Sequence, residues 1–182
     1  MAVAKLVRHE PVVVVLMGVA GAGKTTVGRA LAAELKWPFL DADDFHTPEN
    51  KERMRAGTPL TDAQREPWLA TLRGYVADTL TNGRSAVLAC SALRRRYREA
   101  LLPPGAASDA VRFVHLRTGT DVLASRLARR TRHFMPASLL PSQLATLEEP
   151  AEDEPALIVD GSRPVLALVL DIVRSLDQTA QA

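Results

Sequence analysis

The stretch GVAGAGKT at residues 18–25 decides the fold of this 182-residue chain. It matches the pattern G-x-x-x-x-G-K-[ST] of a phosphate-binding P-loop. The context that this motif requires is also present, since the apolar run VVVVLM at 12–17 precedes it and a helical pattern follows it. The glycines let the backbone curl so that successive N–H groups point into one hollow and can bind phosphate oxygens. The sequence therefore predicts a nucleotide-binding α/β protein.

The end of the motif carries side chains with separate expected roles. Lys24 should reach the β- and γ-phosphates of the nucleotide, and the Thr25 hydroxyl should hold Mg²⁺. The backbone of residues 21–25 should bind the donor phosphates. The residues expected to bind the nucleotide here are Gly18, Gly21, Ala22, Gly23, Lys24, Thr25 and Thr26.

Length and composition limit the class of protein. A chain of 182 residues suits a single domain with its own hydrophobic core, so residues 1–182 are interpreted as one unit. The one cysteine, Cys90, lies in an apolar run, which favours a buried packing role and a reducing compartment. No secretory signal is visible, and no apolar run reaches the roughly 18 residues of a membrane span. We expect a cytoplasmic location and no membrane partner.

Arginines are grouped although the net charge is only +2. The two groups, at 94–98 and 126–132, suit phosphate ligands but could also bind a nucleic acid. Acidic residues are nearly as numerous as basic ones and only 4% of residues are aromatic, so platforms for base stacking are scarce. We expect no nucleic-acid partner, and solvated helix faces would account for about half of these arginines.

Hydrophobic patterns predict five strands with helices between them. The expected strands are 12–17, 39–40, 85–90, 111–116 and 157–159. The expected helices are 24–35, 48–57, 62–82, one that follows a turn at 91–92 and ends near 102, one from 120 onward, 141–147 and 165–176. Thr47 and Asp62 are the expected N-caps of the second and third helices. This alternation predicts a three-layer α/β/α fold with a mostly parallel five-stranded sheet.

Three carboxylates, Asp41, Asp43 and Asp44, follow the second expected strand. Ligands bind at the carboxyl ends of the strands in parallel sheets, so these side chains should lie beside the P-loop. A turn that is merely rich in aspartate is the alternative without chemistry.

With these segments placed, the chain resembles the gluconate kinases of the P-loop kinase group, which are related in fold to the shikimate and nucleoside-monophosphate kinases. The resemblance covers nearly the whole chain. It rests on GVAGAGKT at 18–25, DADDFH at 41–46, GTPLTDAQREPWL at 57–69, ACSALRRRYRE at 89–99, RHFM at 132–135 and SQLATLEEP at 142–150. One position departs from the family's pattern, because Arg132 stands where a glycine is expected before His133 in the predicted lid.

The resemblance implies that the protein uses ATP and Mg²⁺ to phosphorylate D-gluconate to 6-phospho-D-gluconate. Residues of about 42–83 would form an acceptor-binding insert, and residues of about 126–142 a lid. Asp41 would hold a water bound to the metal, and Asp43 would accept the proton of the attacking hydroxyl, with Asp44 as the fallback. Arg65 could bind the gluconate carboxylate with two hydrogen bonds.

Other side chains are candidates for binding the substrate or the nucleotide, and a purely structural role is the alternative. The further substrate-binding candidates are His46, Arg53, Ser91, Arg94, His133 and Gln143. Trp68 is expected to pack in the core, with a wall of the sugar pocket as the alternative. In the lid, Arg130 would bridge the phosphates as a catalytic residue and Arg126 would stack on adenine, while Arg129 could share either role. The adenine side could also include residues 160–163.

Two rival functions stay open at this level. A related small-molecule kinase would use shikimate or a nucleoside monophosphate as the acceptor. A nucleic-acid-binding NTPase would use the arginines at 94–98 and would bind oligonucleotides in a salt-sensitive way. We expect D-gluconate and ATP as partners, and the sequence leaves a homodimer open.

Overall fold

A sheet of five parallel strands forms the centre of the computed structural model, which describes residues 10–129 and 136–179. The strand order is β2-β3-β1-β4-β5. The strands are β1 (Val13–Met17), β2 (Phe39–Asp41), β3 (Ala86–Ala89), β4 (Val111–Arg117) and β5 (Ala156–Asp160). All four pairings in the described sheet are parallel. The predicted α/β class is confirmed, and the sheet is wholly rather than mostly parallel.

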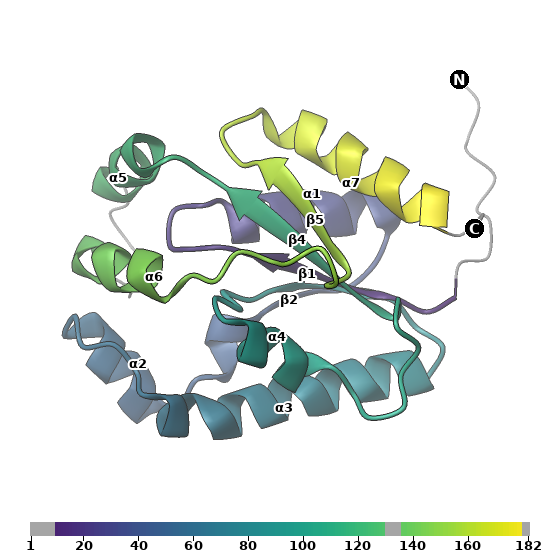
Figure 1. Ribbon diagram of the computed structural model, residues 1–182, viewed down its shortest axis with the longest axis horizontal. Helices are drawn as coiled ribbons and strands as arrows, with labels where there is room; N and C mark the ends of the chain where they lie inside the picture. Colours follow the sequence, from purple (N-terminus) through teal and green to yellow (C-terminus); the bar gives the residue numbers. More distant parts are fainter. Residues whose placement is uncertain (1–9, 130–135, 180–182) are drawn as a thin grey trace.

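Helices cover both faces of this sheet and produce the three predicted layers (Figure 1). One face is covered by α1 (Lys24–Leu35) and α7 (Val165–Thr179), with α5 (Thr120–Ala128) and α6 (Leu140–Thr146) adding to the same core. The other face is covered by α3 (Asp62–Thr81) and α4 (Arg95–Leu101). The shorter elements are the 3₁₀ turns η1 (Ala42–Phe45) and η2 (Ala137–Leu139) and the helix α2 (Pro48–Arg55).

The side chains of β1 explain why both faces are apolar. Val14 and Leu16 pack with α1 and α7, whereas Val13, Val15 and Met17 pack with α3 and α4. Successive side chains of a strand point to opposite faces, so a strand covered on both sides needs a continuous apolar run. All five residues are fully buried, which places β1 at the centre of the molecule.

One helix start differs from the prediction. Thr61, not Asp62, is the N-cap of α3, since its hydroxyl accepts a hydrogen bond from the Gln64 N–H (3.3 Å) and Gln64 Oε1 accepts one from the Thr61 N–H (2.9 Å). This reciprocal pair is a capping box. Asp62 is thereby the first helical residue, and its carboxylate accepts hydrogen bonds from Tyr97 and Arg96 of α4. Thr47 and Pro48 begin α2 as predicted.

The turn between β3 and α4 is longer than the sequence predicted. The sequence predicts a turn of Ser91 and Ala92 before the helix, but α4 begins at Arg95 and residues 91–94 form an irregular turn. Ala92 in this turn has a φ of 44°, in the left-handed region that residues with a side chain seldom adopt. The turn is buried at Ala92 and Leu93, so packing holds it in this shape.

The parallel sheet places its chemistry at one end. The arrowheads of the strands in Figure 1 point toward the side on which α2, α5 and α6 lie. The loops that follow β1, β2 and β3 carry the P-loop, the aspartates and Ser91, so these segments meet at that end. Cys90 lies in the core as expected, and burial raises the pKa of its thiol to about 12. Within residues 10–129 and 136–179, no helix is long and apolar enough to cross a membrane.

Candidate active site

The P-loop joins the end of β1 to the start of α1. Gly18 and Gly23 have φ angles of 138° and 103°, which a residue with a Cβ would adopt only under strain. A Cβ on Gly18 would also lie 3.2 Å from the Leu116 carbonyl oxygen. Gly23 is the N-cap of α1, so the N–H groups of the first turn and the positive end of the helix dipole face the loop. The backbone therefore forms an anion site.

Lys24 and Thr25 extend from the first turn of α1 in different directions. The Lys24 ammonium donates hydrogen bonds to the carbonyl oxygens of Gly18 and Val19, each at 3.0 Å. The Thr25 hydroxyl donates to Asp41 Oδ2 at 2.8 Å, and Asp41 Oδ1 accepts from the Asp43 N–H at 3.2 Å. Asp41 thus connects the P-loop helix to the turn that carries Asp43.

Thr25 and Asp41 are the protein groups best suited to a divalent ion. Mg²⁺ prefers oxygen ligands and usually takes one or two carboxylates together with substrate phosphates and waters. Among the described residues, no group of three or more His, Cys, Asp or Glu side chains is placed so that it could hold a metal ion by itself. A hydroxyl and a carboxylate 2.8 Å apart beside a phosphate loop fit a magnesium ion that is completed by a nucleotide.

A pocket lies directly beside the P-loop, at the carboxyl end of the sheet. Five predicted substrate-binding residues line it together, namely Asp43, His46, Arg65, Ser91 and Gln143. They come from η1, the residue after it, α3, the turn after β3, and α6. We call this the acceptor pocket. Its remaining lining residues are Met54, Pro59, Leu60, Trp68, Leu93, Tyr97, Leu139, Ser142 and Thr146.

Asp43 is the carboxylate that faces both the P-loop and the acceptor pocket. Burial raises the pKa of this carboxyl to about 6, with Asp41 and Asp44 adding to the rise and Lys24 opposing it. At neutral pH the group is ionised, yet it binds a proton more readily than an ordinary aspartate. These are the properties of a general base that works near neutrality.

His46 and Trp68 form one wall of the pocket. Their rings stack with centroids 4.2 Å apart, and the Trp68 indole N–H donates to the Ala42 carbonyl at 2.8 Å. Trp68 is only 6% exposed, so it serves both as core and as pocket wall. Burial lowers the pKa of His46 to about 4, helped by Lys51 and Arg65, which leaves the imidazole neutral.

The Nδ1 atom of His46 has no hydrogen-bond partner within the part of the chain that the structure describes. His46 is 7% exposed, so bulk water does not solvate this atom freely. Buried polar atoms are nearly always paired, and one that is not paired in a pocket is a point where a ligand can bind. A hydroxyl group of a ligand would satisfy it.

Three arginines surround the ring of Tyr97. The guanidinium carbons of Arg65, Arg94 and Arg96 lie 5.5, 5.9 and 5.4 Å from the ring centroid. Only Arg65 also lines the acceptor pocket, where it donates a hydrogen bond to the Leu60 carbonyl. Arg94 pairs with Asp62 at 3.7 Å and is not among the lining residues. Of these three arginines, Arg65 is thus the one that can contact a ligand in the acceptor pocket.

Arg53 lies on the exposed side of α2, while its neighbour Met54 is the residue of that helix in the acceptor pocket. Gln143 lies between the two functional regions, because its Oε1 accepts a hydrogen bond from the Ala20 N–H of the P-loop at 2.6 Å. It therefore connects α6 to the phosphate loop and also lines the acceptor pocket.

A second pocket lies on the outer side of the P-loop. Residues of the loop line it together with Arg126, Arg129, Gly161 and Arg163. The Arg126 guanidinium donates to the carbonyls of Gly21 (3.3 Å), Ala22 (3.2 Å) and Gly161 (2.9 Å), so it ties the P-loop to the turn between β5 and α7. This pocket contains part of the stretch 160–163 that the sequence placed on the adenine side. We call it the donor pocket.

Three predicted lid residues, Arg130, Arg132 and His133, lie outside the described residues, so their roles stay predictions. The sequence missed Tyr97, Ser142 and Thr146 as lining residues of the acceptor pocket. Leu93, Tyr97 and Leu101 recur at a spacing of four and are all buried, and this spacing was the available signal for Tyr97. Ser142 and Thr146 have no comparable signal.

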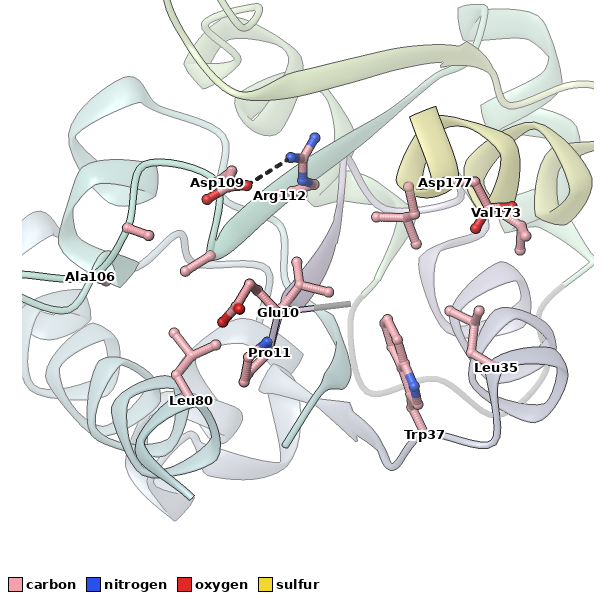
Figure 2. Close-up of a pocket in the computed structure, with 14 residues that line it drawn as sticks. Glu10, Pro11, Leu35, Trp37, Leu80, Ala106, Asp109, Arg112, Val173 and Asp177 are labelled. Atoms are coloured by element: carbon pink, nitrogen blue, oxygen red, sulfur yellow. Dashed lines mark hydrogen bonds and ion pairs between the residues drawn. The ribbon is translucent and has the colours of Figure 1, made fainter. Parts of the chain in front are cut away.

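Another pocket lies at the opposite end of the sheet. Figure 2 shows Leu35 at the end of α1, Trp37 after it, Leu80 of α3 and Val173 of α7 around this pocket. Asp109 and Arg112 form an ion pair at its edge (3.5 Å). Ligands of parallel α/β sheets bind at the carboxyl ends of the strands, so this pocket is not assigned to the reaction.

A P-loop at the carboxyl end of an all-parallel sheet, beside a pocket that a buried aspartate lines, is the arrangement of a P-loop kinase of small molecules. A family model described as an AAA domain matches residues 13–150. Gluconokinase from Gluconobacter oxydans (strain 621H) is 48% identical over 169 residues, covering 91% of each chain. The chain belongs to the gluconokinase family.

Solved structures agree with this assignment. A gluconokinase from Sinorhizobium meliloti 1021 has a TM-score of 0.81 and 40% identity, with 95% of each chain covered. A sugar kinase from Janibacter sp. HTCC2649, in an unliganded structure, has a TM-score of 0.85 and 43% identity, with 92% of this chain and 95% of that one covered. The family resemblance predicted from the sequence motifs is confirmed.

Proposed function

We propose that the protein transfers the γ-phosphoryl group of ATP to D-gluconate and releases 6-phospho-D-gluconate and ADP. The observation that carries this proposal is the position of Asp43 between the P-loop and an acceptor pocket that offers a cation, a neutral imidazole and hydroxyl groups. A sugar acid needs such a set, since it has one carboxylate and several hydroxyls. Gluconate is what the similar gluconokinases are named for.

On the donor side, the P-loop amides and Lys24 would bind the phosphates of ATP. Thr25 and Asp41 would hold Mg²⁺, which in kinases neutralises charge on the phosphates as the group is transferred. Arg126, Arg129 and the turn at 160–163 would form the nucleoside side of the site. The stacking of Arg126 on adenine and the bridging role of Arg130 remain part of this proposal.

On the acceptor side, Asp43 would accept the proton of the attacking hydroxyl, and Arg65 would bind the carboxylate. His46 would exchange a hydrogen bond with a sugar hydroxyl through its buried Nδ1. Ser91 and Gln143 would bind further hydroxyls, while Arg53, Arg94 and His133 would have to approach from outside the described pocket lining. Residues of about 42–83 would act as the acceptor-binding insert and those of about 126–142 as the lid.

The single buried cysteine is in keeping with a reducing cytoplasm.

An acceptor screen tests this proposal. ATP and Mg²⁺ are supplied with gluconate, shikimate or a nucleoside monophosphate, and ADP release is followed by a coupled assay. Of the three acceptors, we expect only gluconate to be phosphorylated by the wild-type enzyme. The folded Lys24→Ala variant should not turn over, because that lysine neutralises phosphate charge. Turnover with another acceptor in preference to gluconate would contradict the substrate assignment, and an active Lys24→Ala enzyme would contradict the P-loop assignment.

A further inference from the structure

Arg98 of α4 is the most deeply buried charged residue described, with 1% of its surface exposed. Its guanidinium group donates two hydrogen bonds to the Glu154 carboxylate, through Nε and Nη2, the latter at 2.8 Å to Oε1. The Nη1 atom donates to the backbone carbonyls of Ala92 (3.1 Å) and Glu148 (2.9 Å). Glu154 has a side chain that is only 7% exposed, so the pair is shielded from solvent.

Two of the carbonyls that Nη1 contacts, those of Ala92 and Glu148, belong to two different segments beside the acceptor pocket, and a third, that of Leu93, lies at 3.5 Å. Ala92 lies between Ser91 and Leu93, which line the pocket from the end of β3. Glu148 follows α6, whose residues Ser142, Gln143 and Thr146 also line the pocket. The Glu148 N–H also donates to the Leu93 carbonyl at 2.7 Å, so the same two segments are joined twice.

The turn at residues 91–94, to which Arg98 donates a hydrogen bond, has an unfavourable backbone conformation at Ala92. Ala92 has a φ of 44°, and a residue with a side chain keeps such a conformation only when its surroundings impose it. A hydrogen bond from a buried guanidinium to the Ala92 carbonyl is such a constraint. Without it, the turn could relax and Ser91 would move relative to Asp43 and Gln143.

We propose that Arg98 is a positioning residue for the acceptor. It fixes the distance between the Ser91 wall and the α6 wall of the acceptor pocket by bridging Ala92 and Glu148, while Glu154 fixes the guanidinium group itself. Arg98 does not line the pocket, so it acts through the groups that do. The inference rests on the proposed function, because it names what shapes the acceptor side of that same site.

A neighbouring pair provides a matched control. Arg95 of the same helix binds Asp153 of the same loop with two hydrogen bonds, at 3.0 and 2.7 Å. Its side chain is 45% exposed and that of Asp153 is 62% exposed, so the pair contributes little to stability. No hydrogen bond from the Arg95 side chain to a pocket wall is described. If tethering the loop to α4 were all that mattered, the two arginines would behave alike.

The experiment compares three variants with the wild-type enzyme. Arg98→Lys keeps a positive charge beside Glu154, but its three donors on one nitrogen cannot replace two hydrogen bonds to the carboxylate and two to the carbonyls of Ala92 and Glu148. The double variant Arg98→Met with Glu154→Leu removes the pair without leaving a buried unpaired charge, so it should fold. Arg95→Lys is the control. Thermal melting checks the fold, and KM is measured separately for gluconate and for ATP.

We expect both Arg98 variants to raise the KM for gluconate ~10- to 100-fold, because small displacements of positioning groups have effects of this order. The KM for ATP should change less than about threefold, and Arg95→Lys should match the wild type. Rescue should be partial, with Arg98→Lys closer to the wild type than the double variant. A merely structural arginine would lower the melting temperature without separating the two KM values.

The proposal is overturned if the folded variants bind gluconate normally, if both KM values rise together, or if neither variant folds. Failure of the proposed function would look different, since the wild-type enzyme itself would then not phosphorylate gluconate.

Discussion

At the scale of single residues, the site depends on how burial changes two neighbouring groups. Asp43 becomes a better proton acceptor, with a pKa of about 6, and His46 becomes a neutral hydrogen-bonding group, with a pKa of about 4. Both shifts have desolvation as their largest cause, because burial disfavours the charged form of either group. Burial beside the same pocket therefore makes Asp43 a stronger proton acceptor and keeps the imidazole of His46 neutral, so that it can form a hydrogen bond with a hydroxyl.

Asp43→Asn should lower kcat by ~10²-fold or more, since removal of a general base usually has this effect. ATP binding should persist. In the wild-type enzyme, kcat/KM should fall as the pH drops below about 6, because a protonated Asp43 cannot accept a proton. Steady-state rates between pH 5 and pH 8 measure this fall in kcat/KM. A larger defect in Asp44→Asn would move the role to Asp44.

Arg65→Ala should raise the KM for gluconate steeply. A charge-assisted pair between a guanidinium and a carboxylate contributes about 1.5–3 kcal/mol, which is roughly 10- to 150-fold in affinity. The KM for ATP should hardly change. Arg55→Ala is a suitable control, because Arg55 is exposed and pairs only with Glu52 among the interactions described for it. If Arg65→Ala weakened ATP and not gluconate, the acceptor pocket would be misplaced.

At the scale of elements, two connections hold the donor side together. Arg126 of α5 binds carbonyls of both the P-loop and the turn after β5. In that turn Gly161 has little space, because a Cβ there would meet the Thr118 hydroxyl and would lie 3.3 Å from Leu116 Cβ and 3.4 Å from the Ala22 carbonyl oxygen. The donor pocket is thus shaped by the close approach of β4, β5 and the P-loop.

Gly161→Ala should raise the KM for ATP at least about fivefold, since overpacking of this kind costs ~1 kcal/mol or more. The added methyl group would displace the turn and the acceptor of the Arg126 hydrogen bond. The KM for gluconate should stay within about twofold. Gly119→Ala is the matched control, because a Cβ there meets nothing within 4 Å. An unchanged KM for ATP would show that the turn adapts.

At the scale of the whole molecule, the functional groups also affect stability toward acid. His46 and His115 are buried and have pKa values below the ordinary 6.5, chiefly because of desolvation. For His115, Arg117 and Arg98 add to the lowering and Glu149 opposes it. Below pH 6.5 the unfolded chain therefore binds more protons at these two histidines than the native protein does, which destabilises the fold. Asp43 acts in the opposite direction, since the native carboxyl binds a proton below about pH 6 and the unfolded one only near 3.8.

With two histidines against one aspartate, the melting temperature should be lower at pH 5 than at pH 7.5. The carboxylates with lowered pKa values, such as Glu154, lose their contribution only below their ordinary value of 4.5, so pH 5 isolates the other three groups. Circular dichroism melts measure the difference. His46→Gln should reduce it and Asp43→Asn should enlarge it. A higher melting temperature at pH 5 than at pH 7.5 would contradict the expectation that the two histidines outweigh Asp43.

The sequence by itself determined the local features. The glycine spacing and the apolar run before it specify a P-loop, and the alternation of strand and helix patterns specifies a three-layer sheet, because both follow from backbone geometry over short stretches. The position of Asp43 after a predicted strand was also sufficient to place it at the carboxyl end of the sheet, whereas Arg65 and Ser91 became candidates through the family resemblance. Boundaries such as the Thr61 cap were missed, since two adjacent residues could each cap the helix.

Only the tertiary structure decided which of several similar side chains does what. Arg94, Arg95, Arg96 and Arg98 are nearly equivalent in sequence, yet one is fully buried and the others are partly or largely exposed. The difference comes from Glu154, which is 56 residues away along the chain and meets Arg98 only after β4 and α6 have folded. The neutral state of His46 likewise depends on packing against Trp68 and on two cations. Burial and charge are properties of the assembled surroundings, so no local pattern encodes them.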